Sequence, residues 1–93
     1  MTIDVIRKKT LEIVDEYPIK SIVLFGSRAE GTNREDSDVD LIVEFSTSVT
    51  LLTLARLRIR LEELLGVDVD VIHGPMRDTD LLDVGKVVEL YAA

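Results

Sequence analysis

The sequence predicts an α/β (α+β) domain in which helices cover mainly one face of a mixed three-stranded sheet. Three runs of β-branched and apolar residues, typical of strands, are separated by polar or amphipathic stretches. The link between the first two runs is too short for a full crossover helix, whereas residues 46–66 leave room for one before the third run. A chain of 93 residues suffices for one such core, so a single domain over residues 1–93 is expected.

The first part of the chain is expected to form a helix, a strand and a short helical turn. Apolar side chains recur at helical spacing over residues 3–16. Pro18 ends this helix, because proline lacks the amide hydrogen that a helix needs. The apolar, β-branched run over residues 20–25 predicts a strand that is buried on both faces. A glycine and a serine follow at once, and residues 28–30 then form the short helical turn.

The second part is expected to contain two more strands, joined and followed by helices. The strands are VDLIVEF, residues 39–45, and VDVDVIH, residues 67–73. A helix of about residues 50–65 joins them and ends at Gly66, a natural C-terminal stop. A closing helix is expected over residues 78–91.

The composition excludes several classes of protein. Acidic residues outnumber basic residues by 18 to 11, and the net charge of −7 disfavours direct binding of nucleic acid. The chain has no cysteine, which excludes disulfides, thiolate metal sites and a cysteine nucleophile. The charged N-terminus lacks the apolar core of a signal peptide, and no run is apolar enough to span a membrane. A cytoplasmic protein without membrane contact is therefore expected.

The turn after the first strand is the first candidate site. A buried strand that stops at Gly26-Ser27 and turns into a helix directs unpaired backbone N–H groups outward, which suits an anion. Glycine allows a ligand to approach the backbone closely, and serine adds a hydroxyl group. From these residues alone, a simple turn with a helix N-cap stays open as an alternative. A phosphate loop of the Walker type is excluded, because Thr32 stands where that loop needs lysine.

Aspartates on the second and third strands form the other candidate site. Asp38 and Asp40 are two residues apart, so both point to the same side of the sheet. Alternation with valine leaves Asp68 and Asp70 on the face away from the core, and either can join that pair. Carboxylates so close repel one another unless a cation neutralises them, and carboxylates suit Mg²⁺ or Mn²⁺. For the pair alone, a solvated strand end stays open as an alternative.

Taken together, GSRAEG, SDVDL and VDVI resemble the motif of the minimal nucleotidyltransferases of the DNA polymerase β-like superfamily. The resemblance spans nearly the whole chain and implies a polymerase β palm-like nucleotidyltransferase fold. It implies that Gly26 and Ser27 bind the nucleotide triphosphate, while Arg28 keeps one positive charge there. It also implies that three acids are catalytic and bind the metal: Asp38, Asp40 and Asp70. The expected metal is a pair of Mg²⁺ ions, with Mn²⁺ as an alternative.

The same resemblance implies an activity and a partner. Small proteins of this family are commonly antitoxins that pair with HEPN-type toxin ribonucleases and transfer AMP from ATP to a tyrosine of the toxin. A hetero-oligomer with such a toxin is then expected. Glu30 departs from the family pattern, because many relatives carry a basic residue there. Two alternatives stay open: a non-catalytic antitoxin that inhibits by binding alone, and transfer of AMP to a small molecule or RNA.

A mixed stripe on the helix of residues 50–65 is a candidate interface. Beside a leucine stripe that suits the core, this helix carries a second row of aliphatic and charged side chains. Aliphatic residues flanked by arginines suit a protein interface, although a solvent-exposed helix face is the simpler interpretation of the pattern. The stripe consists of Leu52, Arg56, Ile59, Arg60 and Glu63.

Overall fold

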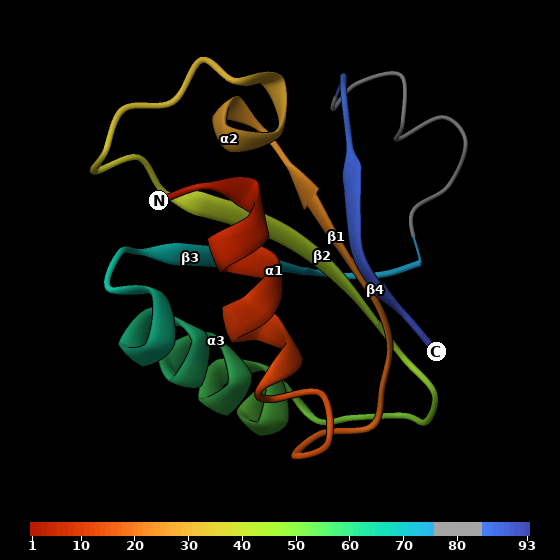
Figure 1. The fold of residues 1–93 in the computed structure, drawn as a ribbon. Coiled ribbons are helices and arrows are strands. Elements are labelled where there is room, and N and C mark those ends of the chain that lie inside the picture. The colour runs from red at the N-terminus through yellow and green to blue at the C-terminus, as the bar shows by residue number, and fades with distance from the viewer. Residues whose placement is uncertain (76–84) are drawn as a thin grey trace.

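The computed structural model describes residues 1–75 and 85–93, which contain a four-stranded sheet (Figure 1). Its strands lie in the order β3-β2-β1-β4. The elements follow one another along the chain as α1 (Ile3–Leu11), β1 (Ile19–Phe25), α2 (Ser27–Glu30), β2 (Val39–Phe45), α3 (Leu51–Leu65), β3 (Val69–His73) and β4 (Val88–Ala92).

The sheet is mixed, as predicted, and the length of each link sets the strand directions. β1 pairs with β2 in antiparallel orientation across the short α2 link, whereas β2 and β3 run parallel on either side of α3. A parallel pair needs a long crossover, which α3 provides. Figure 1 shows α1 and α3 on the same face of the sheet and α2 at the end of β1. The predicted fold class is confirmed, with one strand more than expected.

The predicted helix over residues 78–91 is wrong at its C-terminal end. There the chain forms β4, which pairs with β1 in antiparallel orientation. Residues 78–84 of that prediction lie outside the described residues. Gly85 has a φ of 71° and precedes the strand, in which Leu90 is buried and Glu89 is exposed. This alternation has the period of a strand. β4 also supplies partners to the second edge of the buried β1, whose backbone groups need them.

Two other elements are shorter than predicted. α1 ends at Leu11, and turns follow as far as Pro18. In these turns, backbone amides donate hydrogen bonds to carbonyl oxygens three residues earlier in the chain. These tighter turns keep Ile13 in the core with none of its surface exposed. β3 begins at Val69, because the left-handed residue Gly66 ends α3 and the chain needs the next residues to reach the sheet.

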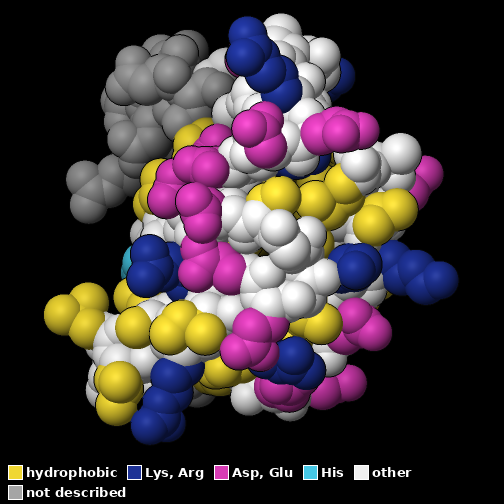
Figure 2. Space-filling model, turned by 90° about the vertical axis from the view of Figure 1, so that its left-hand side faces the viewer, with side chains coloured by type: hydrophobic (Ala, Val, Ile, Leu, Met, Phe, Trp, Pro, Cys, Tyr) yellow, Lys and Arg dark blue, Asp and Glu magenta, His cyan; other side chains and the backbone are white. Residues whose placement is uncertain are grey.

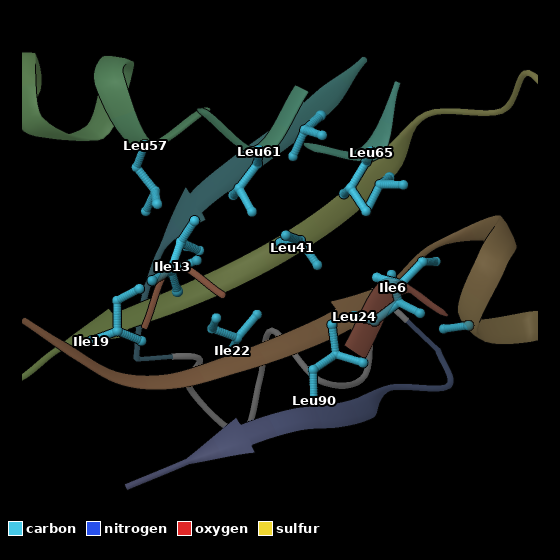
Figure 3. Close-up of a cluster of buried hydrophobic side chains, with 14 residues drawn as sticks. Ile6, Ile13, Ile19, Ile22, Leu24, Leu41, Leu57, Leu61, Leu65 and Leu90 are labelled. Atoms are coloured by element: carbon cyan, nitrogen blue, oxygen red, sulfur yellow. The ribbon is translucent and has the colours of Figure 1, made fainter. Parts of the chain in front are cut away.

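The core lies between the sheet and the two long helices (Figure 3). α3 contributes three leucines to it, each at most 7% exposed. Because side chains alternate along a strand, burying Val39 and Leu41 of β2 in this core places the intervening Asp40 on the opposite face. Within the described residues, no helix combines the length and the apolar character needed to cross a membrane. The core residues are Ile6, Ile13, Ile19, Ile22, Leu24, Ala29, Val39, Leu41, Val43, Leu57, Leu61, Leu65, Val69 and Leu90.

Candidate active site

The turn after β1 lies directly against a carboxylate of β2. Gly26 has a φ of 77° and a ψ of −158°, a conformation that is essentially restricted to glycine. A Cβ atom on it would stand 3.2 Å from Cγ of Asp40 and closer still to Oδ2. The antiparallel register explains this contact, because Phe25 pairs with Asp40. The two candidate sites are therefore one site, and glycine is required there both by its backbone and by the space available.

The turn also presents free hydrogen-bond donors. The amides of Ala29 and Glu30 both donate to the carbonyl oxygen of Gly26, at 3.1 Å each. The two preceding amides, of Ser27 and Arg28, have no acceptor among the described residues. The hydroxyl group of Ser27, a half-buried residue, likewise has no hydrogen-bond partner among the described residues. Unpaired donors of this kind at the start of a helical turn can bind phosphate oxygens.

The strand register selects the third acid. Asp40 and Asp70 are direct partners in the parallel pairing of β2 and β3, so their side chains lie side by side on the same face. Asp68 instead precedes β3, and its carbonyl oxygen accepts a hydrogen bond of 2.9 Å from Val39. Asp38 lies exposed just before β2. The structure thus brings Asp70 next to Asp40, while the catalytic roles of these acids remain predictions.

The surroundings of Asp40 disfavour its ionised carboxylate. Its pKa is raised above the ordinary value, first by burial, then by the side chain of Asp70 as hydrogen-bond partner and as charge, and finally by the charge of Asp38. Within the described residues, no basic side chain forms an ion pair with any of the three acids. Negative charge held without a basic partner favours a site that receives a cation.

The donor set suits a hard divalent cation, although its geometry is incomplete. Within residues 1–75 and 85–93, no three acidic or histidine side chains already stand together as a metal site. Asp38 and Asp70 are exposed, so their side chains have room to turn toward Asp40. Mg²⁺ commonly takes only one or two carboxylates from the protein and the remaining ligands from phosphates and water. A metal bound together with a nucleotide therefore fits these residues better than a metal bound alone.

We expect Asp40→Asn to leave the metal-free protein as stable as the wild type at neutral pH, or more stable. A raised pKa means that the folded state holds this proton more tightly than the unfolded state. The ionised carboxylate therefore destabilises the fold above that pKa, and the penalty fades as the pH falls through it. Urea unfolding at neutral and mildly acidic pH should show that the advantage of the variant shrinks on acidification. Asp36→Asn, in the exposed loop, is the control, and a clear loss of stability in Asp40→Asn at neutral pH would contradict the expectation.

Arg28 is bound to the loop that precedes β2. It is 3% exposed, and its guanidinium donates to the carbonyl oxygen of Ser37 from Nη2 at 2.8 Å and from Nε at 3.2 Å. Nη2 also donates to the carbonyl oxygen of Glu35 at 3.0 Å. Nη1 is buried and has no partner among the described residues. Direct contact between Arg28 and a nucleotide thus stays a prediction, whereas its contact with the loop is observed.

Sequence reasoning missed two contacts at this site. Neither the packing of Gly26 against Asp40 nor the bonds from Arg28 to backbone carbonyls has a side-chain signature in the sequence. The carboxylate of Glu30, the residue that departs from the family pattern, lies against Gly85, where an added Cβ would be 2.6 Å from Oε1.

In this mixed sheet the turn after β1 lies against Asp40 of β2, and Asp40 lies beside Asp70 of β3. A family model described as nucleotidyltransferase domain matches residues 6–89. The chain belongs to this family.

A relative from Methanocaldococcus jannaschii, provisionally named a protein adenylyltransferase, is 42% identical over 93 residues, which is 95% of this chain and 100% of the relative. Two solved structures share the fold at lower identity. A toxin–antitoxin crystal structure with AMP-PNP has a TM-score of 0.76 and 22% identity, covering 94% of this chain and 73% of the other. A complex of tri-AMPylated Shewanella oneidensis HEPN toxin with MNT antitoxin has a TM-score of 0.72 and 19% identity. The match covers 99% of this chain and 74% of the other chain.

Proposed function

We propose that this protein is a Mg²⁺-dependent adenylyltransferase that moves AMP from ATP to a tyrosine hydroxyl of a HEPN-type toxin, and so acts as its antitoxin. The observation that carries the proposal is the contact of the Gly26 turn with the Asp40 carboxylate, because it places unpaired backbone donors that suit phosphate beside an acid that suits a metal ion. Family membership supports the reaction class. The nucleotide analogue and the AMPylated toxin in the two structural neighbours support the donor and the acceptor.

The residues of the site divide into two groups by what they would bind. The free amides of the turn and the hydroxyl of Ser27 would donate to phosphate oxygens, and the bare Cα of Gly26 would let the phosphates approach. The charge of Arg28 would add attraction for the triphosphate. Bound Mg²⁺, or Mn²⁺, would neutralise the phosphates and favour deprotonation of the acceptor, with two ions expected. The proposed ligands are Asp38, Asp40 and Asp70.

The proposed transfer is an in-line displacement at phosphorus. The acceptor oxygen forms a bond to the α-phosphorus of ATP, and the bond to the leaving pyrophosphate breaks. The proton of the acceptor hydroxyl goes to a carboxylate. We assign this role to Asp70, because it is exposed and lies beside Asp40 on β3, an edge strand of the described sheet.

A protein acceptor agrees with the surface of α3. Leu51, Leu52 and Ile59 are 84%, 60% and 49% exposed, and the exposed Arg56 lies among them. Figure 2 shows hydrophobic and basic side chains next to one another in the lower part of the view, below a group of acidic ones. Exposed aliphatic side chains with arginines suit a protein interface. Within the mixed stripe, Arg60 forms an ion pair with Glu16, with 3.4 Å between its Nε atom and Oε1 of Glu16.

Incubation of the protein with its toxin and Mg²⁺-ATP tests the proposal. Each transferred AMP should raise the mass of the toxin by about 329 Da, the covalent gain from metal-assisted transfer. Peptide mapping should locate the added mass on tyrosine, and ribonuclease activity should fall with the extent of modification. An unmodified toxin that is inhibited by stoichiometric binding would favour the non-catalytic alternative. Label from ATP that appears in RNA or in a small molecule would instead favour the alternative in which AMP is transferred to such an acceptor.

We expect Ser27→Ala to weaken ATP binding by roughly 1.5–3 kcal/mol, the contribution of a hydrogen bond to a charged oxygen. The hydroxyl is half-buried and has no partner among the described residues, so its loss should leave the fold unchanged. Calorimetric titration with Mg²⁺-ATP measures the effect. Ser48→Ala, in the exposed link before α3, is the matched control. Equal affinity in the two variants would remove this turn from the site.

A further inference from the structure

We infer that Arg28 is a positioning residue that couples the phosphate-binding turn to the loop carrying Asp38. It follows Ser27 directly, and its guanidinium binds the carbonyl oxygen of Ser37, the residue immediately before Asp38. One side chain therefore joins the backbone that would bind phosphate to the backbone that presents a metal-binding acid. This inference rests on the proposed function, and it assigns to Arg28 an action through the loop and not through direct contact with phosphate.

The burial of Arg28 is costly, which indicates that the residue does more than fill space. Only 3% of it is exposed, and within the described residues no carboxylate lies within ion-pair distance of it. Its Nη1 atom is buried without a partner. A buried charge that lacks a counter-ion and leaves a donor unpaired lowers stability, and an apolar side chain could pack there at lower cost. What the guanidinium supplies instead is three hydrogen bonds to the loop.

The loop between α2 and β2 has few other anchors. Within it, the amide of Arg34 donates to Oγ of Ser37 at 2.8 Å, and the amide of Ser37 donates back to the carbonyl oxygen of Arg34 at 3.1 Å. These two bonds close a local turn but do not fix it to the rest of the protein. Pairing with β3 begins only at Val39, whose amide donates to Asp68. The start of the loop is tied to α2 by Thr32, whose amide donates to the carbonyl oxygen of Ser27 at 2.9 Å. Among the described hydrogen bonds, only those of Arg28 join the turn of residues 34–37 itself to α2.

Arg28→Lys is the decisive variant, because it keeps the charge and loses the planar fork that reaches two carbonyl groups. We expect amide hydrogen exchange over residues 34–38 to accelerate in the free protein. The affinity for Mn²⁺, measured by electron paramagnetic resonance with a saturating non-hydrolysable ATP analogue, should fall about 10- to 100-fold, as for other partners that orient metal ligands. ATP affinity without metal should stay at the wild-type level. Arg34→Lys, on an exposed side chain of the same loop, is the control and should change none of these.

Chemical rescue provides a second measurement that a purely structural role would not satisfy. In Arg28→Ala, added methylguanidinium should restore slow exchange over residues 34–38 and Mn²⁺ affinity, whereas tetramethylammonium at the same concentration should not. Exchange and Mn²⁺ affinity in Arg28→Lys equal to those of Arg34→Lys would overturn the inference. So would a loss of metal-free ATP affinity alone, because that result identifies direct phosphate contact. The exchange measurement needs no catalysis, so a wild-type protein that transfers no AMP would refute the proposed function while the coupling stayed testable.

Discussion

Asp38→Asn and Asp40→Asn should each lower the rate of AMP transfer by about a thousandfold or more, while the protein stays folded. A metal ion that stabilises charge on a transferring phosphoryl group supplies several kcal/mol, and about 4 kcal/mol corresponds to that factor. Asparagine has nearly the shape of aspartate but brings no negative charge to the metal. Asp38→Asn removes one of the charges that raise the pKa of Asp40, and Asp40→Asn removes that carboxylate itself. Single-turnover transfer with saturating Mg²⁺-ATP measures the rate.

Asp36→Asn is the matched control for both variants. Asp36 lies in the loop that carries Asp38 and is exposed, so the change alters the net charge equally without touching the proposed metal ligands. It should transfer AMP at a rate close to that of the wild type. Wild-type activity in either test variant would show that the carboxylate assignment is wrong, and equal losses in all three would indicate a general charge effect.

Gly26→Ala should damage both folding and transfer. The backbone conformation of Gly26 costs about 1–3 kcal/mol for a residue with a side chain. In addition, the new methyl group would overlap the carboxylate of Asp40, which must then move. A displacement of about 1 Å in a catalytic group can cost about a hundredfold in rate, so we expect at least that loss. Urea unfolding and single-turnover transfer measure the two effects separately.

Two further variants separate backbone strain from the clash. Gly66→Ala introduces a methyl group at a φ of 74°, at the C-terminal end of α3, where no atom of the described contacts lies within 4 Å of it. It should lose stability through strain and keep its transfer rate. Combining Gly26→Ala with Asp40→Ala removes the carboxylate that the methyl group meets, so part of the lost stability should return as a coupling between the two sites. Additive effects would contradict the contact between Gly26 and Asp40.

The elements that the sequence predicted well are those whose pattern is local. Apolar, β-branched runs predict β1 and β2, and the glycine at position 66 predicts the end of α3. The directions of the β1–β2 and β2–β3 pairs also follow from the sequence, because link length decides whether a crossover fits. The helix predicted at the C-terminal end is wrong from Gly85 onward, where the described residues form no helix. From Val88 the chain is a strand, because pairing with β1, a contact distant in sequence, fixes that segment.

The same division holds for the site. Spacing in the sequence was sufficient to propose the glycine–serine turn and the acids, since side chains two residues apart on a strand must share a face. It could not choose between Asp68 and Asp70, because that choice depends on the register in which β3 pairs with β2. It could not show that Gly26 packs against Asp40, or that Arg28 binds the loop before Asp38. These contacts join a backbone atom to a distant residue, and only the folded sheet, which sets the distance between separate segments, determines them.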